Sequence, residues 1–151
     1  MSATTIREAT AADLDAVLAL YEALESVPGQ GLALEEAEAV FAQFQRYPSY
    51  RLFVACDSAR PEAVVGSYAL LVMHNLAHRG APSAVVEDVV VAHALRGRGI
   101  GRQMMAHAVQ QAHAAGCYKL ALSSHRKRTE AHAFYESLGF AQHGLSFVME
   151  P

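Results

Sequence analysis

Three glycines alternate with other residues between an apolar segment and a helical pattern. They lie in the segment Arg96-Gly97-Arg98-Gly99-Ile100-Gly101-Arg102. Glycine lets main-chain N–H groups approach a ligand closely, and the N-terminus of a helix adds unpaired N–H donors and a positive dipole end. The three arginines add fixed positive charge around the same turn. This pattern predicts a phosphate-binding loop, with a plain strand-to-helix turn as the alternative.

The spacing of these glycines differs from the two common nucleotide-binding motifs. A Walker loop requires Lys followed by Ser or Thr, and neither dipeptide occurs in this sequence. A dinucleotide fingerprint requires Gly-x-Gly-x-x-Gly and an acidic residue about 20 positions later, and here Lys119 lies near that position. The predicted loop therefore belongs to neither class.

The elements that must position this loop alternate between strand and helix patterns. Strands are predicted at residues 6–9, 52–56, 64–73, 84–91, 118–123 and 146–150. Helices are predicted from Ala11 to about Ser26, ending at a break over residues 28–31, around residues 34–44, from Ile100 to Ala115 with Gly116 as a C-cap, and at residues 129–137. No repeat or linker interrupts this order, so residues 1–151 are predicted to form one domain.

Charged residues are unevenly distributed along the 151 residues, whose net charge is −3. Residues 1–62 contain ten carboxylates and four arginines, whereas residues 63–151 contain eight Lys and Arg and five carboxylates. The acidic balance argues against a nucleic-acid partner. The basic half contains the glycine loop, which suggests an anionic ligand.

Composition excludes two further classes of protein. No apolar run approaches the ~20 residues of a membrane span, so no membrane partner is expected. Cys56 and Cys117 lie far apart in apolar runs, which is typical of reduced thiols in a soluble, cytoplasmic protein. The eight histidines form no His-Glu-x-x-His motif, and Cys-x-x-Cys is absent, so no metal is expected.

Two motifs resemble those of the GNAT superfamily of acetyl-CoA-dependent N-acetyltransferases. Val89-x-Val91 followed by Arg96-Gly97-x-Gly99-Ile100-Gly101 is similar to its pyrophosphate loop. Ala131-x-x-Phe134-Tyr135-Glu136-x-Leu138-Gly139-Phe140 is similar to its C-terminal block. The element order also fits. The resemblance implies a GNAT fold of the α/β (α+β) class, with a mixed central sheet of about six to seven strands flanked by about four helices.

The resemblance also implies that acetyl-CoA is the cosubstrate. Its pantetheine arm is expected to pair with the strand at residues 89–91, and its pyrophosphate to bind the N–H groups of residues 97–102. The predicted cofactor-binding residues are Val89, Val90, Val91, Arg96, Gly97, Arg98, Gly99, Ile100, Gly101 and Arg102. Many family members have Asn where this chain has Arg128, so no role is assigned to it. Residues 126–128 are either a solvated basic turn or a contact for the 3′-phosphate or an anionic substrate.

Glu87 is the candidate base of such an enzyme. An amine with a lysine-like pKa of ~10.4 is mostly protonated at neutral pH and must lose a proton before it attacks a thioester. Glu87 is a carboxylate in a segment otherwise suited to burial, directly before the cofactor-binding residues. In a regular strand Glu87, Val89 and Val91 share a face and Asp88 points the other way. The alternative is a salt-bridged strand residue.

Tyr135 is implied by its place in the family motif to donate a proton to the CoA thiolate. The alternative is a helical tyrosine packed with Phe134 and Phe140. A free N–H near Val89 is the candidate oxyanion donor.

The acceptor amine is the least constrained part of the prediction. Residues 87–91 with 116–119 resemble glucosamine-6-phosphate N-acetyltransferases, and residues 125–135 resemble aminoalkylphosphonate acetyltransferases. Asp88, His74, Arg79 and Ser123 are the candidate acceptor-binding residues. The leading hypothesis is acetylation of a small-molecule primary amine. The alternatives are a transferase for a protein N-terminus or lysine, and a non-catalytic acyl-CoA-binding regulator. Because the family often dimerises, a homodimer is a candidate assembly.

Overall fold

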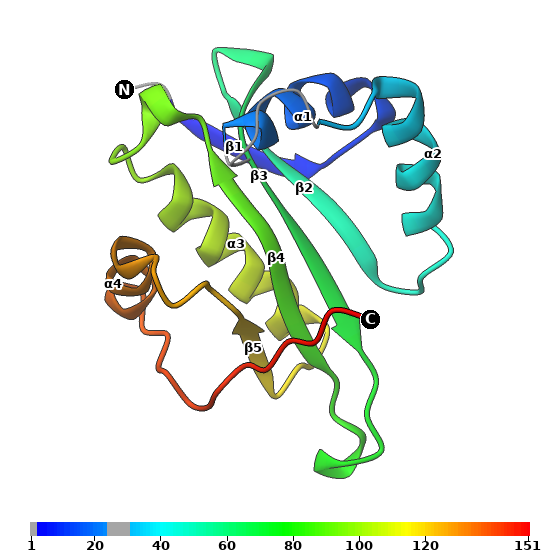
Figure 1. Cartoon of the computed structure of the whole chain (residues 1–151), viewed down its shortest axis with the longest axis vertical. Helices are drawn as coiled ribbons and strands as arrows, with labels where there is room; N and C mark the ends of the chain where they lie inside the picture. The colour runs from blue at the N-terminus through cyan, green and yellow to red at the C-terminus, as the bar shows by residue number, and fades with distance from the viewer. Residues whose placement is uncertain (1–2, 24–30) are drawn as a thin grey trace. The chain divides into compact units, whose positions relative to one another are not determined.

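A computed structural model describes residues 3–23 and 31–151 of the chain (Figure 1). Its strands are β1 (Thr4–Glu8), β2 (Tyr50–Asp57), β3 (Arg60–Met73), β4 (Ser83–Val91) and β5 (Lys119–Leu122). Its α-helices are α1 (Leu14–Glu22), α2 (Leu34–Phe44), α3 (Ile100–Ala114) and α4 (Thr129–Ser137), and short 3₁₀ turns are η1 (Ala11–Asp13), η2 (His78–Gly80) and η3 (His93–Leu95). The chain divides into two compact units, Met1–Ala121 and Leu122–Pro151.

One mixed sheet with the strand order β1-β2-β3-β4-β5 organises the first unit. Neighbouring strands from β1 to β4 are antiparallel. The N–H of Tyr118 donates to the carbonyl of Pro82 at 2.9 Å, which joins the start of β5 to the start of β4. These two strands run in the same direction (Figure 1), and helix α3 connects them. Parallel neighbours require such a crossover connection.

Helices pack on both faces of this sheet. On one face, Val17 of α1 lies in an apolar cluster with Leu52, Val54 and Ala69 of β2 and β3. On the other face, α3 approaches β3 closely at Gly66, where an added Cβ would lie 2.7 Å from the Sδ of Met104. A side chain at this position would require the Met104 side chain or α3 itself to shift. The two faces are called here the α1 face and the α3 face.

A polar network crosses the interface between α3 and the sheet. The hydroxyl of Tyr68 lies 2.6 Å from Nδ1 of His107, and an Nη atom of Arg51 donates to Gln111 at 3.0 Å. The Arg51 guanidinium also lies over the ring of Phe53, 4.9 Å from its centroid. Burial lowers the pKa of His107, and the positive charge of Arg51 lowers it further.

The expected strand at residues 146–150 is wrong. Residues 145–151 adopt no regular secondary structure, so the sheet has five strands rather than six to seven. An alternating apolar pattern forms a strand only when a neighbouring strand receives its main-chain hydrogen bonds, and in the described chain this segment has no such neighbour. Its apolar side chains therefore remain in solvent, with Leu145, Phe147, Val148 and Met149 between 85% and 94% exposed.

The other predicted elements are found, with shifted ends. The first helix begins as the turn η1 and continues as α1 to Glu22, while its expected end near Ser26 and the expected break over residues 28–30 lie outside the described residues. The helix at residues 129–137 is confirmed at both ends. None of the helices in residues 3–23 and 31–151 is both long and apolar enough to cross a membrane.

Candidate active site

Strand β4 contains one residue more than its pairing with β3 requires. Ser67 is paired with Val90 and Ala69 with Glu87, so two steps along β3 match three steps along β4. Asp88 lies inside this interval and has a φ of 53°, in the left-handed region. Such an extra residue is a β-bulge, which bends a strand and redirects its side chains.

The bulge changes which residues of β4 share a face. Directly paired residues of antiparallel strands point to the same face. Glu87 is paired with Ala69 on the α1 face, whereas Val91 is paired with Gly66, which packs against α3. The expectation that Glu87, Val89 and Val91 share a face is therefore wrong, because it assumed a regular strand.

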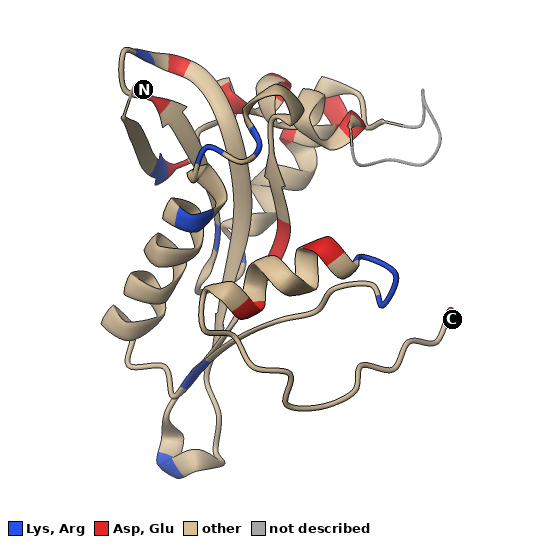
Figure 2. Cartoon of the chain, turned by 90° about the vertical axis from the view of Figure 1, so that its left-hand side faces the viewer, with Lys and Arg blue, Asp and Glu red and all other residues tan. Residues whose placement is uncertain are grey.

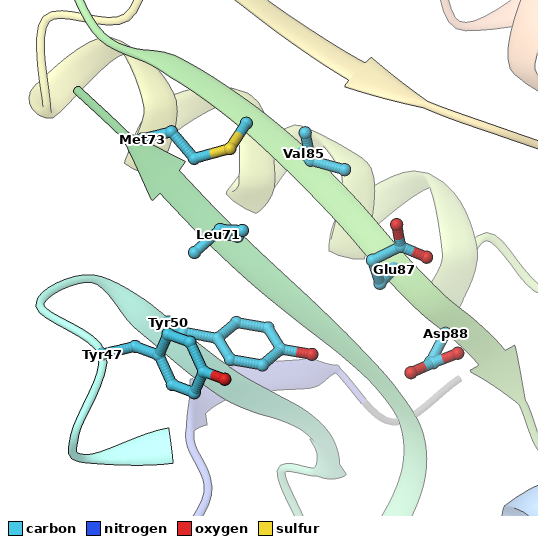
Figure 3. Close-up of a pocket in the computed structure, with 7 residues that line it drawn as sticks. All are labelled: Tyr47, Tyr50, Leu71, Met73, Val85, Glu87 and Asp88. Carbon is cyan, nitrogen blue, oxygen red and sulfur yellow. The ribbon is translucent and has the colours of Figure 1, made fainter. Parts of the chain in front are cut away.

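A pocket of about 530 Å³ lies beside the bulge (Figure 3). Glu87 and Asp88 both line it, although a regular strand would have pointed them in opposite directions. Their shared orientation follows from the left-handed backbone at Asp88. The remaining lining side chains are aromatic or aliphatic and come from the turn before β2 and from β2, β3 and β4: Tyr47, Tyr50, Leu71, Met73 and Val85.

The two carboxylates face water and the tyrosines. Both are exposed, and among the described residues neither forms an ion pair, so the salt-bridge interpretation of Glu87 finds no support. Burial raises the pKa of Tyr50, and the negative charges of Asp88 and Glu87 raise it further. Burial likewise raises the pKa of Tyr21 to about 12, with the charge of Asp88 adding to it. The pocket therefore has a negative electrostatic potential around its tyrosines.

The glycine loop leads into the N-terminus of α3. Gly97 and Gly99 have φ values of 78° and 82°, and an added Cβ at either would meet nothing within 4 Å. Glycine is thus required here by the backbone conformation and leaves the main chain open. The first main-chain bond of α3 runs from Gln103 to Gly99 at 3.0 Å, and no described side chain caps this end. The N–H groups of residues 100–102 therefore lack helical acceptors.

Positive charge surrounds this helix terminus. Figure 2 shows Lys and Arg on the loop before α3 and in its first turn. Arg96 Nε donates to the carbonyl of Val91 at 3.4 Å, which ties the loop to the end of β4. Arg98 and Arg102 are exposed. Open N–H groups with flanking arginines are the features that an anion site requires, and the phosphate-binding role of this loop stays a prediction.

The second half of β4 extends beyond its neighbour. β5 begins level with β4 but has four residues against nine, so residues 88–91 reach past it within the described first unit. Main-chain groups on that side of β4 are available to an extended ligand, which can bind as an added strand.

Tyr135 lies on α4 in the second unit. Its ring centroid is 5.2 Å from that of Phe134 and 5.8 Å from that of Phe140, the packing that the alternative interpretation expected. Burial raises the pKa of the Tyr135 phenol, with the charge of Arg128 opposing this, so the hydroxyl keeps its proton at neutral pH. A protonated phenol is what a general acid requires.

The other predicted acceptor-binding residues are not among the described lining of the pocket. His74 follows the lining residue Met73 at the end of β3, and Arg79 lies in η2 with a φ of 60°. Ser123 is exposed in the second unit. Tyr47 and Tyr50 were not predicted, although the alternation of Tyr50 with Leu52 and Val54 along β2 would have placed it on their face.

Comparison with known proteins shows the family to which this chain belongs. The model of the acetyltransferase (GNAT) family matches residues 14–140, which include the bulge, the glycine loop and Tyr135. The chain belongs to the GNAT acetyltransferase family. It is an N-acetyltransferase, and enzymes of this family use acetyl-CoA to acetylate amines.

Similar proteins indicate the range of amines on which this family acts. The acetyltransferase is 33% identical over 134 residues to the probable glucosamine 6-phosphate N-acetyltransferase 2 of Oryza sativa, covering 87% of this chain and 78% of that one. It is 32% identical to the aminoalkylphosphonate N-acetyltransferase of Salmonella typhimurium, covering 98% and 92%. A solved structure of a putative acetyltransferase from Agrobacterium tumefaciens superposes with a TM-score of 0.87 at 39% identity, over 97% of this chain and 99% of that one.

Proposed function

We propose that this acetyltransferase transfers the acetyl group of acetyl-CoA to the primary amine of a small molecule by direct attack. The supporting observation is the bulge, because it presents Glu87 and Asp88 to one pocket near the end of β4, and the glycine loop follows that strand after the short turn η3. The residues that activate the amine and those that bind the acetyl donor would thus lie close together along the chain, on β4 and in the loop that leads into α3.

In this proposal the cofactor lies along β4 and the start of α3. The pyrophosphate accepts hydrogen bonds from N–H groups of residues 97–102, and Arg96, Arg98 and Arg102 balance its charge. The pantetheine arm pairs with the open main-chain groups of Val89, Val90 and Val91. The N–H of Val89, next to the bulge, donates to the oxyanion of the tetrahedral intermediate.

The proposed reaction needs one base and one acid. Glu87 accepts a proton from the ammonium group of the substrate, directly or through water. The free amine attacks the thioester carbonyl carbon to form the C–N bond. When the C–S bond breaks, Tyr135 donates its proton to the leaving thiolate. The positively charged nitrogen of the intermediate loses its extra proton, which restores the Tyr135 hydroxyl, and the proton held by Glu87 passes to water. The products are the N-acetylated amine and CoA.

The remaining predictions are also part of this proposal. Both units act as one domain, which is supported by a family match that runs across their boundary. The chain forms a homodimer, which is supported by the exposed apolar side chains between Leu145 and Met149. A cytoplasmic location fits the acetyl donor. His74, Arg79 and Ser123 remain candidates for contacts to outer parts of the acceptor.

One assay tests the central proposal. The full chain is incubated with acetyl-CoA and a panel of phosphorylated amines, polyamines, amino acids and aminoglycosides, and thiol release is measured. At least one amine is expected to support turnover that Glu87→Gln reduces. Tight CoA binding without turnover of any amine would favour a non-catalytic acyl-CoA-binding protein instead.

A further inference from the structure

The walls of the pocket are apolar and fixed in place. Tyr50 stacks on Phe44 of α2 with ring centroids 4.3 Å apart and planes 12° apart, and Tyr47 meets Tyr50 edge-on at 5.8 Å. Next to Tyr50, Leu71 of β3 and Val85 of β4 continue one cross-strand row on the same face of the sheet (Figure 3). Aromatic and aliphatic surfaces of this kind favour an apolar ligand body.

The charged groups of the pocket are negative. Glu87 and Asp88 are its only charged lining side chains among the described residues, and neither is neutralised by an ion pair there. An ammonium group would supply the missing counter-charge, and the π-faces of the tyrosines would also attract it.

No cation of the sheet is placed to receive a phosphate in this pocket. Arg51 is next to Tyr50 in sequence, but the strand alternation directs it to the α3 face, where it contacts Gln111 and Phe53. Lys, Arg and His are absent from the described pocket lining. Within this described lining, a phosphate dianion would meet two carboxylates and no positively charged side chain.

We infer that the acceptor of this enzyme is a primary amine with an uncharged, apolar body, and that phosphorylated amines are disfavoured. This inference rests on the proposed function and narrows it. It distinguishes the chain from the relatives to which it is similar, whose names specify phosphorylated or phosphonate-bearing amines.

Substrate preference tests this inference directly. We expect kcat/KM for 2-phenylethylamine to exceed that for glucosamine 6-phosphate and for 2-aminoethylphosphonate by about tenfold or more, because like charges repel in the pocket. A preference for either phosphorylated amine would overturn the inference while leaving the proposed function intact. If no amine is turned over, the proposed function fails. Calorimetric titration of the same three amines into the CoA-bound chain then still shows whether the pocket binds the apolar amine more tightly than the two anionic ones.

A charge substitution gives a second, independent test. Met73 lies at the pocket and is 38% exposed, so Met73→Lys adds a cation without disturbing the core. We expect this variant to raise kcat/KM for glucosamine 6-phosphate about tenfold and to lower it for 2-phenylethylamine. Leu76→Lys is the matched control, because Leu76 is fully exposed, does not line the pocket and receives the same charge. Equal effects of the two variants would contradict the inference.

Discussion

Glu87 and Val90 lie on the same face of the sheet although they are three residues apart on one strand. In a regular strand they would point to opposite faces. The bulge at Asp88 accounts for this relationship, and with it for the meeting of two carboxylates in one pocket.

Asp88 has two features that substitutions can test separately: its left-handed backbone conformation in the bulge and its negative charge. Asp88→Asn keeps a residue type that tolerates φ near 53°, whereas Asp88→Val places a β-branched residue there. We expect Asp88→Val to lower the free energy of unfolding by about 1–2 kcal/mol and Asp88→Asn to leave it nearly unchanged, measured by urea denaturation. Equal stability of the two variants would argue against a strained position.

Removing the proposed base should change the pH profile as well as the rate. We expect Glu87→Gln to lower kcat about 10²-fold or more at pH 7. The deficit should shrink as pH approaches the amine's own pKa of ~10, because the substrate then arrives unprotonated. Rates measured from pH 6 to 10 check this, and a deficit that stays constant across that range would exclude Glu87 as the base.

Removing the hydroxyl of Tyr135 should lower kcat and leave the KM for acetyl-CoA nearly unchanged. We expect Tyr135→Phe to lower kcat about 10²-fold while the KM for acetyl-CoA changes little, because the ring still packs between Phe134 and Phe140. Stopped-flow or steady-state thiol release measures both constants. A folded variant with unchanged kcat would leave Tyr135 with a packing role.

The glycine loop should be sensitive to a single methyl group through its backbone. Gly99→Ala places a side chain at a φ of 82°, so we expect a loss of about 1 kcal/mol of stability and a several-fold rise in the KM for acetyl-CoA. Gly144→Ala is the control, because its Cβ also meets nothing within 4 Å and its φ is not in the left-handed region. Similar KM values for acetyl-CoA in both variants would argue against a cofactor-binding role for the loop.

The polar network between α3 and the sheet, which includes His107, should make the free energy of unfolding depend on pH. The pKa of His107 is lowered in the folded protein from its ordinary value of 6.5, so the unfolded chain binds a proton first as pH falls. The stabilising contribution of neutral His107 to the folded protein is therefore fully present above pH 6.5. It is lost as the pH falls from there towards the lower pKa that His107 has in the folded state. Urea unfolding at pH 5 and 7.5 should show a smaller pH dependence for His107→Gln than for the natural chain. The same dependence in both would remove His107 as its cause.

Sequence patterns predicted the elements whose structure depends mainly on their own residues. The helix at residues 129–137 and the glycine-rich turn that opens α3 follow from residue type and spacing. The pocket could not be predicted in the same way, because it depends on the register between β3 and β4, and the extra residue leaves no mark in the sequence of β4. The missing strand at residues 146–150 has a related cause, since pairing requires a partner that no pattern in the segment itself specifies.

The close approach of α3 at Gly66 has a kinetic consequence. It holds α3, whose N-terminus follows the glycine loop, on the face of the sheet opposite the pocket. In the proposed function acetyl-CoA and the amine would therefore approach from different directions. Neither ligand then blocks the path of the other. We therefore expect that either substrate can bind first, and that initial-rate measurements give the intersecting lines of a random-order ternary complex.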